Sequence, residues 1–219
     1  QYTGLMPLSI FSVFNLYALK RDHASEFRNA HKLLMMPDLF NYLLTGEAFN
    51  EYADTTTTAM YNPRDKRWEA RIFEKLGFPQ DLVCEVLMPG TKIGPIQKKV
   101  CDECDLPAIP VIAVASHDTA SAVAGIPVAE TDKKWAFLSL GTWGVAGAET
   151  LEPVLTKDAF EAAILNEGAA DGKTFLARNI TGLWIIQQSR EKWSKAAGKE
   201  IVWEEIVSAA AQASPFQAF

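Results

Sequence analysis

The sequence predicts an α/β fold, in which apolar strands alternate with amphipathic helices. Two short runs, residues 109–114 and 135–140, have the length and apolar composition of buried strands. Apolar residues at helical spacing recur on either side of these runs, and such alternation is typical of α/β proteins. The 219 residues suffice for one large domain or for parts of two.

Composition excludes two classes of partner. With 48% hydrophobic and 22% charged residues, the chain has an ordinary globular mixture. The net charge of −6 and the lack of a long basic run disfavour nucleic-acid binding, because the phosphate backbone requires clustered Lys and Arg. No apolar stretch approaches the roughly 20 residues that span a bilayer. We therefore expect a cytoplasmic protein with small-molecule ligands, whose oligomeric state the sequence leaves unknown.

The ends of the sequence predict an internal piece of a longer protein. The sequence starts at Gln1 without an initiator Met, and no basic region or secretory segment follows it. At the other end, Phe219 comes soon after the Ala-rich residues 209–213. We expect such a piece to expose core surface, and so to have low solubility or to dimerise.

The first two predicted helices cover residues 9–20 and 24–44, where apolar residues recur at helical spacing. Pro37 is expected to break the second helix, and Gly46 to end it.

A polar segment separates these helices from the next one. Residues 50–61 are rich in Thr and too polar for a core helix, so we expect a loop, a capped turn or a partly exposed helix. Helical spacing returns over residues 68–76 and is ended by Gly77. The Pro- and Gly-rich residues 87–94 predict irregular connecting structure.

The second half of the chain predicts a further strand and two helices. The strand at 135–140 is followed by a short one at 145–147, and helices are expected over 180–197 and 203–213. Residues 126–132, between the two apolar strands, are a candidate crossing between domains.

Cys101 and Cys104 have the spacing that zinc sites and redox motifs use. A zinc site would need a second Cys or His pair, and none is close in the sequence. The acidic neighbours Asp102 and Glu103 would raise the thiol pKa values, which disfavours a redox role. We therefore predict ordinary thiols and no metal site.

The polar residues His117, Asp118 and Thr119 follow directly after an apolar strand. Ligands of α/β proteins bind beyond the carboxyl ends of strands, so this position suits catalysis. The alternative is a helix N-cap, in which Asp118 or Ser116 satisfies free backbone N–H groups. The spacing leaves both interpretations open.

Gly141 and Thr142 follow the strand at 135–140 in a Gly-Thr turn. Such a turn can offer backbone N–H groups and a hydroxyl to phosphate oxygens, and glycine allows close approach of the phosphate. The pattern is neither a Walker A loop nor a GxGxxG fingerprint, and most such turns are only turns.

Residues 166–168 and the start of the helix predicted at 180–197 form a third polar group. Asn179 stands at the start of that helix, and Gln187 lies two turns later. On residue type alone, a helix N-cap is the favoured role of Asn179.

Together these segments resemble the FGGY family of carbohydrate kinases, and within it the rhamnulokinases most closely. The similarity lies in ordered segments at residues 37–46, 51–56, 114–123, 138–143, 166–168 and 179–184. The resemblance implies two actin-like, RNase H-like α/β domains with the active site in the cleft between them, present here only in part. Residues 1–126 would be the later part of the sugar-binding N-terminal domain, and 127–219 the first part of the nucleotide-binding C-terminal domain.

The resemblance also implies roles for particular residues. Asp118 would be the catalytic base and, with His117 and Thr119, would bind the sugar, while Asn179 would contact sugar or phosphate. The nucleotide would be bound by Gly141, Thr142 and Gln187. ATP and Mg²⁺ would be required. The family's N-terminal phosphate hairpin, with an acidic residue for magnesium, and its adenine-binding loop are absent from these residues, so the chain alone is expected to be inactive.

The implied reaction is ATP-dependent phosphorylation of a ketose, with L-rhamnulose to L-rhamnulose 1-phosphate as the first choice. Phe11-Ser12 stands where the family usually has an Asn-Thr pair beside the sugar pocket, so L-fuculose or xylulose is the runner-up. A non-catalytic sugar or nucleotide sensor on the same scaffold is a further alternative. A His-Asp hydrolase is disfavoured, because no G-x-S-x-G nucleophile motif accompanies His117.

Overall fold

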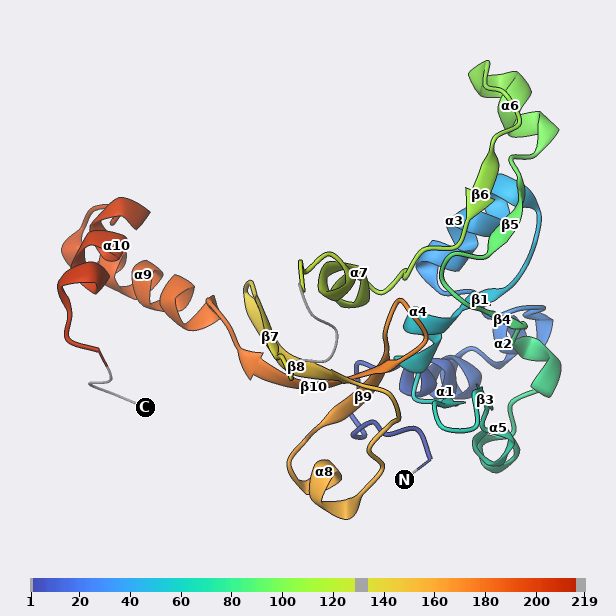
Figure 1. The fold of residues 1–219 in the computed structure, drawn as a ribbon, viewed down its shortest axis with the longest axis horizontal. Helices are drawn as coiled ribbons and strands as arrows, with labels where there is room; N and C mark the ends of the chain where they lie inside the picture. The colour runs from blue at the N-terminus through green and yellow to red at the C-terminus, as the bar shows by residue number, and fades with distance from the viewer. Residues whose placement is uncertain (1, 129–133, 216–219) are drawn as a thin grey trace. The chain divides into compact units, whose positions relative to one another are not determined.

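The computed structural model describes residues 2–128 and 134–215 (Figure 1). It divides into two compact units, of which the first comprises Gln1–Ser139 and Ala146–Arg178. The second comprises Leu140–Val145 and Asn179–Phe219. The mixture of strands and helices confirms the predicted α/β class.

The helices are α1 (Ser12–Asp22), α2 (Ala24–Asn29), α3 (Met36–Thr45), α4 (Tyr52–Thr56), α5 (Ala70–Leu76), the 3₁₀ helix η1 (Gln80–Leu82), α6 (Lys98–Cys104), α7 (Asp118–Ala124), α8 (Lys157–Glu161), α9 (Trp184–Ala197) and α10 (Trp203–Gln212). The strands are β1 (Asn50–Glu51), β2 (Tyr61–Asn62), β3 (Arg67–Trp68), β4 (Val86–Leu87), β5 (Lys92–Pro95), β6 (Pro110–Ile112), β7 (Phe137–Leu140), β8 (Trp143–Thr150), β9 (Leu165–Gly168) and β10 (Thr174–Thr181).

The helix predicted over residues 24–44 is two helices, α2 and α3, separated by non-helical residues. Pro37 lies in the first turn of α3, where its missing N–H leaves no hydrogen bond unmade. The side chain of Asp38 accepts a hydrogen bond from the Met35 N–H at 3.3 Å and so helps to cap this end. Gly46 ends α3 with φ +82°, a left-handed conformation that favours glycine.

The Thr-rich segment is more buried than predicted. Tyr52–Thr56 forms the short helix α4, and its threonines Thr55 and Thr56 are 0% and 1% exposed. The expectation of exposure was wrong, whereas the expected cap is present, since Glu51 caps α4. The hydroxyls of Thr56, Thr57 and Thr58 find partners on the local backbone, while the buried hydroxyl of Thr55 has none in the described part of the chain. Thr56 donates to the Ala53 carbonyl at 2.7 Å, and Thr58 donates to the Thr55 carbonyl at 2.7 Å.

The helix predicted over residues 68–76 begins two residues later, at α5. Trp68 belongs instead to β3, which pairs antiparallel with β2. Glu69 caps α5 by accepting a hydrogen bond from the Arg71 N–H, and Gly77 ends the helix at φ +64°, as predicted. The side chain of Lys20 also donates to the Gly77 carbonyl at 2.9 Å, and this bond ties α1 to the end of α5.

Two further pairs of strands organise the residues between α5 and α7. β1 pairs parallel with β4, and β5 pairs antiparallel with β6. The segment at 87–94 therefore contributes strand residues, although connecting structure was predicted. β6 confirms the strand predicted at 109–114 but not its burial, since Ile109, Ile112 and Val114 are 49%, 44% and 61% exposed.

The four-stranded sheet has the order β7-β8-β10-β9, and these strands lie side by side in Figure 1. β8 contains the short strand predicted at 145–147. β9 and β10 are antiparallel, with Glu167 opposite Phe175. The candidate domain crossing at 126–132 lies largely outside the described residues.

The helix predicted from residue 180 starts only at Trp184, because residues 174–181 form β10. Asn179 is therefore a strand residue, and the prediction that it caps a helix was wrong. α10 confirms the helix predicted at 203–213.

A row of aromatic rings forms part of the core of the first unit. Successive ring centroids lie 5.8 to 6.2 Å apart, mostly edge to face, in the order Phe27, Phe78, Phe73, Trp68, Tyr61 and Tyr52. Such pairs contribute about 0.5–1.5 kcal/mol each beyond the burial of their area. The row connects α2, α5, the β2–β3 hairpin and α4.

The three cysteines are all free thiols. Cys84 is buried, its N–H donates to Asn50 Oδ1 at 3.0 Å, and its carbonyl accepts from Trp68 Nε1 at 2.9 Å. Cys104, at the end of α6, is exposed. No helix within the two described ranges is long and apolar enough to span a membrane.

Candidate functional site

Asp118 begins α7, and its side chain is 97% exposed. The backbone of His117 is the helix N-cap, and no side chain caps this end. The N-cap position is therefore taken by neither Asp118 nor Ser116, although Asp118 still satisfies one backbone N–H of the first turn. Asp118 Oδ1 accepts from the Thr119 N–H at 2.6 Å, and the Thr119 hydroxyl lies 3.4 Å away. The structure thus brings Asp118 and Thr119 together, with a carboxylate open to an incoming ligand.

The His117 ring lies between two carboxyl groups. Its Nε2 is 3.7 Å from Asp118 Oδ1, and its Nδ1 is 3.5 Å from Glu167 Oε2. The ring stacks on the fully buried Phe175, with centroids 6.3 Å apart and planes 13° from parallel. Burial lowers the pKa of His117, while Asp118 and Glu51 act in the opposite direction.

Glu167, in β9, was not predicted to be a site residue. It is 7% exposed, and burial together with the charge of Asp118 raises its pKa to about 7. The sequence marks it only as the middle of the Asn-Glu-Gly segment. Its contact with His117 spans residues far apart in the chain, so no local pattern reveals it.

A second buried carboxylate, Glu51, holds the residue before His117 in place. It is 0% exposed and accepts from the Ser116 N–H at 3.0 Å and the Ser116 hydroxyl at 2.6 Å. It also caps α4 by accepting from the N–H groups of Ala53 at 2.8 Å and Asp54 at 3.2 Å. Four donors satisfy this charge, as a buried carboxylate requires. Sequence reasoning assigned it no role.

Asp38 supports Glu51 from α3. Its carboxylate accepts from the Glu51 N–H at 3.0 Å and from Asn50 Nδ2 at 3.1 Å. The side chain is fully buried, and burial raises its pKa, while the hydrogen bond from Asn50 acts in the opposite direction. A continuous set of hydrogen bonds therefore runs from α3 through Glu51 to Ser116, two residues before Asp118.

The second group of predicted residues lies in the second unit. Gly141 and Thr142 form the turn between β7 and β8, and their carbonyls accept from the N–H groups of Leu183 at 2.8 Å and Trp184 at 3.1 Å. Gln187 Nε2 donates to the Thr142 hydroxyl at 3.4 Å. The structure thus brings together Gly141, Thr142 and Gln187.

The surroundings of Gly141 leave room at the turn. A Cβ at this position would meet nothing closer than the Trp143 carbonyl at 3.7 Å, so neighbouring atoms do not require glycine here. Its own N–H donates to that carbonyl at 2.8 Å and is not free for a ligand. The absence of a side chain, and not this N–H, is what Gly141 offers to a ligand.

The side chain of Asn179 forms no hydrogen bond with the turn residues Gly141 and Thr142 or with Gln187. Asn179 is exposed in β10, and its side chain makes no hydrogen bond to any of the described residues. His117, Asp118 and Thr119 belong to the first unit, whereas Asn179 and the turn residues belong to the second.

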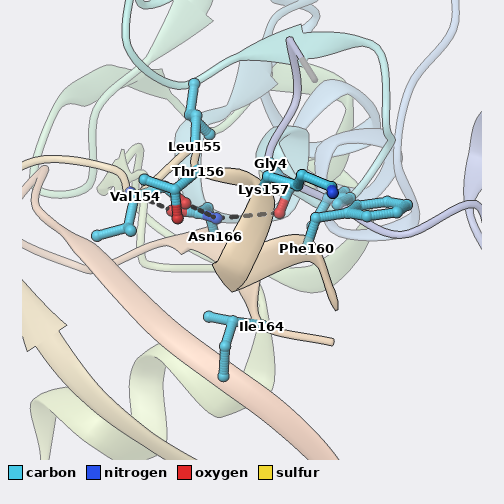
Figure 2. Close-up of a pocket in the computed structure, with 9 residues that line it drawn as sticks. Gly4, Val154, Leu155, Thr156, Lys157, Phe160, Ile164 and Asn166 are labelled. Carbon is cyan, nitrogen blue, oxygen red and sulfur yellow. Dashed lines mark hydrogen bonds between the residues drawn. The ribbon is translucent and has the colours of Figure 1, made fainter. Parts of the chain in front are cut away.

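A separate cavity of about 380 Å³ lies beside β9 (Figure 2). Its lining is Gly4, Leu5, Val154, Leu155, Thr156, Lys157, Phe160, Ile164 and Asn166. Asn166 donates to the carbonyls of Gly4 at 3.0 Å and Val154 at 3.2 Å, and accepts from the Val154 N–H at 2.7 Å. Successive strand residues point to opposite faces, so Asn166 lines this cavity while its neighbour Glu167 approaches His117. The amide is satisfied within the chain, and we assign the cavity no ligand.

Comparisons with known proteins agree over nearly the whole chain. The family model for the FGGY family of carbohydrate kinases, N-terminal domain, matches residues 1–125, and that for the C-terminal domain matches residues 136–219. A rhamnulokinase from Bacteroides thetaiotaomicron is 37% identical over 202 residues, which are 92% of this chain and 41% of that protein. A rhamnulokinase from Enterococcus faecalis is 32% identical over all 219 residues and 42% of its own length.

Solved structures show the same fold. A xylulose kinase from Lactobacillus acidophilus superimposes with a TM-score of 0.78 at 17% identity, over 97% of this chain and 42% of that one. A xylulose kinase from Rhodospirillum rubrum gives 0.75 at 17% identity, over 97% and 43%. The chain spans 41–42% of the length of the two curated relatives above.

Proposed function

Because this chain belongs to the FGGY family of carbohydrate kinases, we propose that the complete protein transfers the γ-phosphoryl group of ATP to a ketose. L-rhamnulose, converted to L-rhamnulose 1-phosphate, is the substrate we favour, since relatives 32% and 37% identical are rhamnulokinases. L-fuculose or xylulose is the alternative. We assign residues 1–126 to the sugar-binding domain and 127–219 to the nucleotide-binding domain.

Asp118 is the residue that we propose as the general base. Its exposed carboxylate, on a helix start held through Ser116 by the buried Glu51, is the observation that carries the proposal. Phosphoryl transfer passes through a loose transition state, so alignment of the sugar hydroxyl with the γ-phosphate does most of the work. A carboxylate within hydrogen-bond reach accepts the hydroxyl proton as the new P–O bond forms.

The remaining predicted residues receive binding roles in this proposal. His117 and Thr119 flank Asp118 and contact the sugar, and Asn179 adds a further polar contact to the sugar. Gly141, Thr142 and Gln187 bind the nucleotide. The hydrogen bond between Gln187 and Thr142 supports this grouping, as does the open space at Gly141.

Magnesium accompanies ATP in such reactions and neutralises charge on the phosphate oxygens. It is usually held by one or two carboxylates together with those oxygens. Within residues 2–128 and 134–215, no group of three or more His, Cys, Asp or Glu side chains could hold a metal ion. We derive no step through the ion.

The proposal is tested by measuring ADP release from the complete protein with magnesium-ATP, with and without L-rhamnulose. We expect a sugar-dependent rate that Asp118→Asn lowers by about 10²-fold or more, the scale of losing a general base. Asp105→Asn, at an exposed position at the end of α6, is the matched control. Stimulation by another ketose alone would keep the mechanism and change the substrate. If no sugar stimulates ADP release, the alternative of a non-catalytic sugar or nucleotide sensor on the same scaffold would be favoured.

A further inference from the structure

Glu167, His117 and Asp118 form a row in which the imidazole separates two carboxyl groups. The two ring nitrogens face opposite ends of the row, at 3.5 Å from Glu167 and 3.7 Å from Asp118. Within the described ranges, no Lys or Arg forms an ion pair with any of the three. Asp118 is 97% exposed and solvated, so the placement of protons matters at the buried end of the row, between Glu167 and His117.

The inner end of the row contains an unsatisfied atom. Nδ1 of His117 is buried and has no hydrogen-bond partner in the described part of the chain. Leaving such an atom unpaired costs about 1–3 kcal/mol. Glu167 Oε2 needs to move only about 0.5 Å to reach an ordinary hydrogen-bond length.

The backbone around Glu167 holds its side chain near the ring. The N–H of the next residue, Gly168, donates to the Thr56 hydroxyl of α4 at 2.7 Å. On the neighbouring strand, Phe175 pairs with Glu167 and stacks on His117. Neither contact supplies a proton to Nδ1, so Glu167 is the group placed to do so.

The protonation states follow from the environment of each group. Burial first, and the charge of Asp118 second, raise the pKa of Glu167 to about 7, which favours its neutral acid. Burial lowers the pKa of His117, which favours neutral imidazole. A neutral ring has one donor and one acceptor nitrogen, and a protonated Glu167 can satisfy the acceptor. The remaining N–H then points towards the carboxylate of Asp118.

We propose that Glu167 is a positioning residue that donates a hydrogen bond to Nδ1 of His117 and fixes the Nε2–H tautomer. A donor, and not a lone pair, then faces Asp118 and the sugar hydroxyl bound beside it. This inference rests on the proposed function of Asp118 as the base. It assigns a role to the Asn-Glu-Gly segment that the family resemblance left unassigned.

The proposal predicts how activity changes with pH. Above about pH 7, Glu167 loses its proton and accepts from Nδ1–H instead. The lone pair of Nε2 then faces the Asp118 carboxylate, and the two repel each other. The other titratable groups at α4 are Glu51, Tyr52 and Asp54. Burial raises the pKa of Tyr52 further above its ordinary value, and burial with the charges of Asp38 and Glu51 raises that of Asp54 to about 6, so Asp54 ionises at lower pH than Glu167. We therefore attribute an alkaline decline in kcat/KM near neutral pH to Glu167.

The kinetic test compares Glu167→Gln with Glu167→Ala in the complete protein, using the ketose that stimulates ADP release. The Gln amide can donate to Nδ1 and does not ionise, so it should restore most of the kcat that Glu167→Ala loses, about tenfold. Glu167→Gln should also lack the alkaline decline, and KM for ATP should stay unchanged in both variants. Glu152→Gln, at an exposed position, is the control. Equal losses in Gln and Ala, or no loss in Ala, would overturn the proposal.

A second readout does not depend on activity. ¹⁵N NMR of histidine-labelled protein reports the tautomer of His117, assigned by the signal that disappears in His117→Gln. We expect an Nε2–H tautomer below pH 7, which the unmodified protein gives up for Nδ1–H at higher pH and which Glu167→Gln retains. An Nδ1–H tautomer of the neutral ring below pH 7 would overturn the inference even if the protein is a kinase. If the unmodified complete protein shows the expected tautomer but releases no ADP in response to any sugar, the proposed function is overturned instead.

Discussion

Glu51 accepts two hydrogen bonds from Ser116, one from its backbone N–H at 3.0 Å and one from its hydroxyl at 2.6 Å. The two residues are 65 positions apart, and Ser116 directly precedes His117 and Asp118. The same carboxylate caps α4. The position of the proposed base therefore depends on a buried charge in a different part of the chain.

Glu51→Gln is expected to lower the free energy of unfolding by about 2–4 kcal/mol. The amide replaces one acceptor oxygen with an NH₂ group that faces N–H donors, which leaves buried groups unpaired. Urea denaturation should show a lower midpoint with an unchanged slope. The exposed Glu47→Gln should change stability by less than about 0.5 kcal/mol. A loss as small as the control's would mean that Glu51 is not holding Ser116 by its charge.

Asp54→Asn should make the protein more stable at pH 8. Burial, and then the charges of Asp38 and Glu51, raise the pKa of Asp54 to about 6. A raised folded-state pKa means that the folded chain binds more protons, so stability falls as pH rises from about 4 to 6. The asparagine variant lacks this loss and should gain about 1–2 kcal/mol, discounted for partial exposure.

Thermal unfolding measured at pH 4 and pH 8 checks the sign of this effect. The difference in melting temperature between Asp54→Asn and the parent protein should be larger at pH 8. Asp105→Asn, exposed at the end of α6, should show no such pH dependence. If Asp54→Asn is less stable than the parent protein at pH 8, neighbouring groups stabilise the charge of Asp54 in the folded state, and the prediction is wrong.

Gly168→Ala is expected to destabilise the first unit by about 1–3 kcal/mol, the usual cost of overpacking. The added Cβ would lie 2.6 Å from a ring carbon of Tyr52 and 3.2 Å from the Cα of Ala53. Both residues are at most 1% exposed, so the neighbours have little room to move. Gly94→Ala, whose Cβ would meet nothing within 4 Å, is the control. Equal melting temperatures for the two variants would contradict the prediction.

Gly182→Ala should weaken nucleotide binding in the complete protein. Its Cβ would lie 2.6 Å from the Trp143 carbonyl carbon and 2.8 Å from the Gly144 nitrogen, so the Gly141-Thr142 turn must shift. We expect KM for ATP to rise about tenfold, equivalent to about 1.4 kcal/mol. Steady-state kinetics with saturating sugar measures this change, and KM for the sugar should stay the same. A change in KM for the sugar with an unchanged KM for ATP would contradict the proposal that this turn binds the nucleotide.

Local signals in the sequence were sufficient for the ends of several helices. Gly46 and Gly77 were predicted to stop helices, and each lies in the left-handed conformation that favours glycine. The fold class also followed from local patterns. Burial did not, because it depends on distant partners. The Thr-rich segment was read as exposed, yet Thr56 lies in the core, where its hydroxyl accepts from the Gly168 N–H.

The candidate site was predictable only in part for the same reason. The position of Asp118 after a strand and at the start of a helix is a local feature, so it was visible in the sequence. Glu51 and Glu167 act through contacts with Ser116 and His117 that only the fold creates. A strand at residues 174–181, where a helix start was predicted, likewise moved Asn179 from a cap to an exposed strand position.

Cys84 can report on opening of the first unit without any added probe. Its thiol is buried, and burial raises its pKa, so both access and thiolate content limit its reaction with alkylating reagents. Cys104 is exposed and should react at once. The slow labelling of Cys84, followed by peptide mass spectrometry, then measures how often the segment between β3 and β4 exposes its interior, and the Cys104 rate supplies the reference for a fully open thiol.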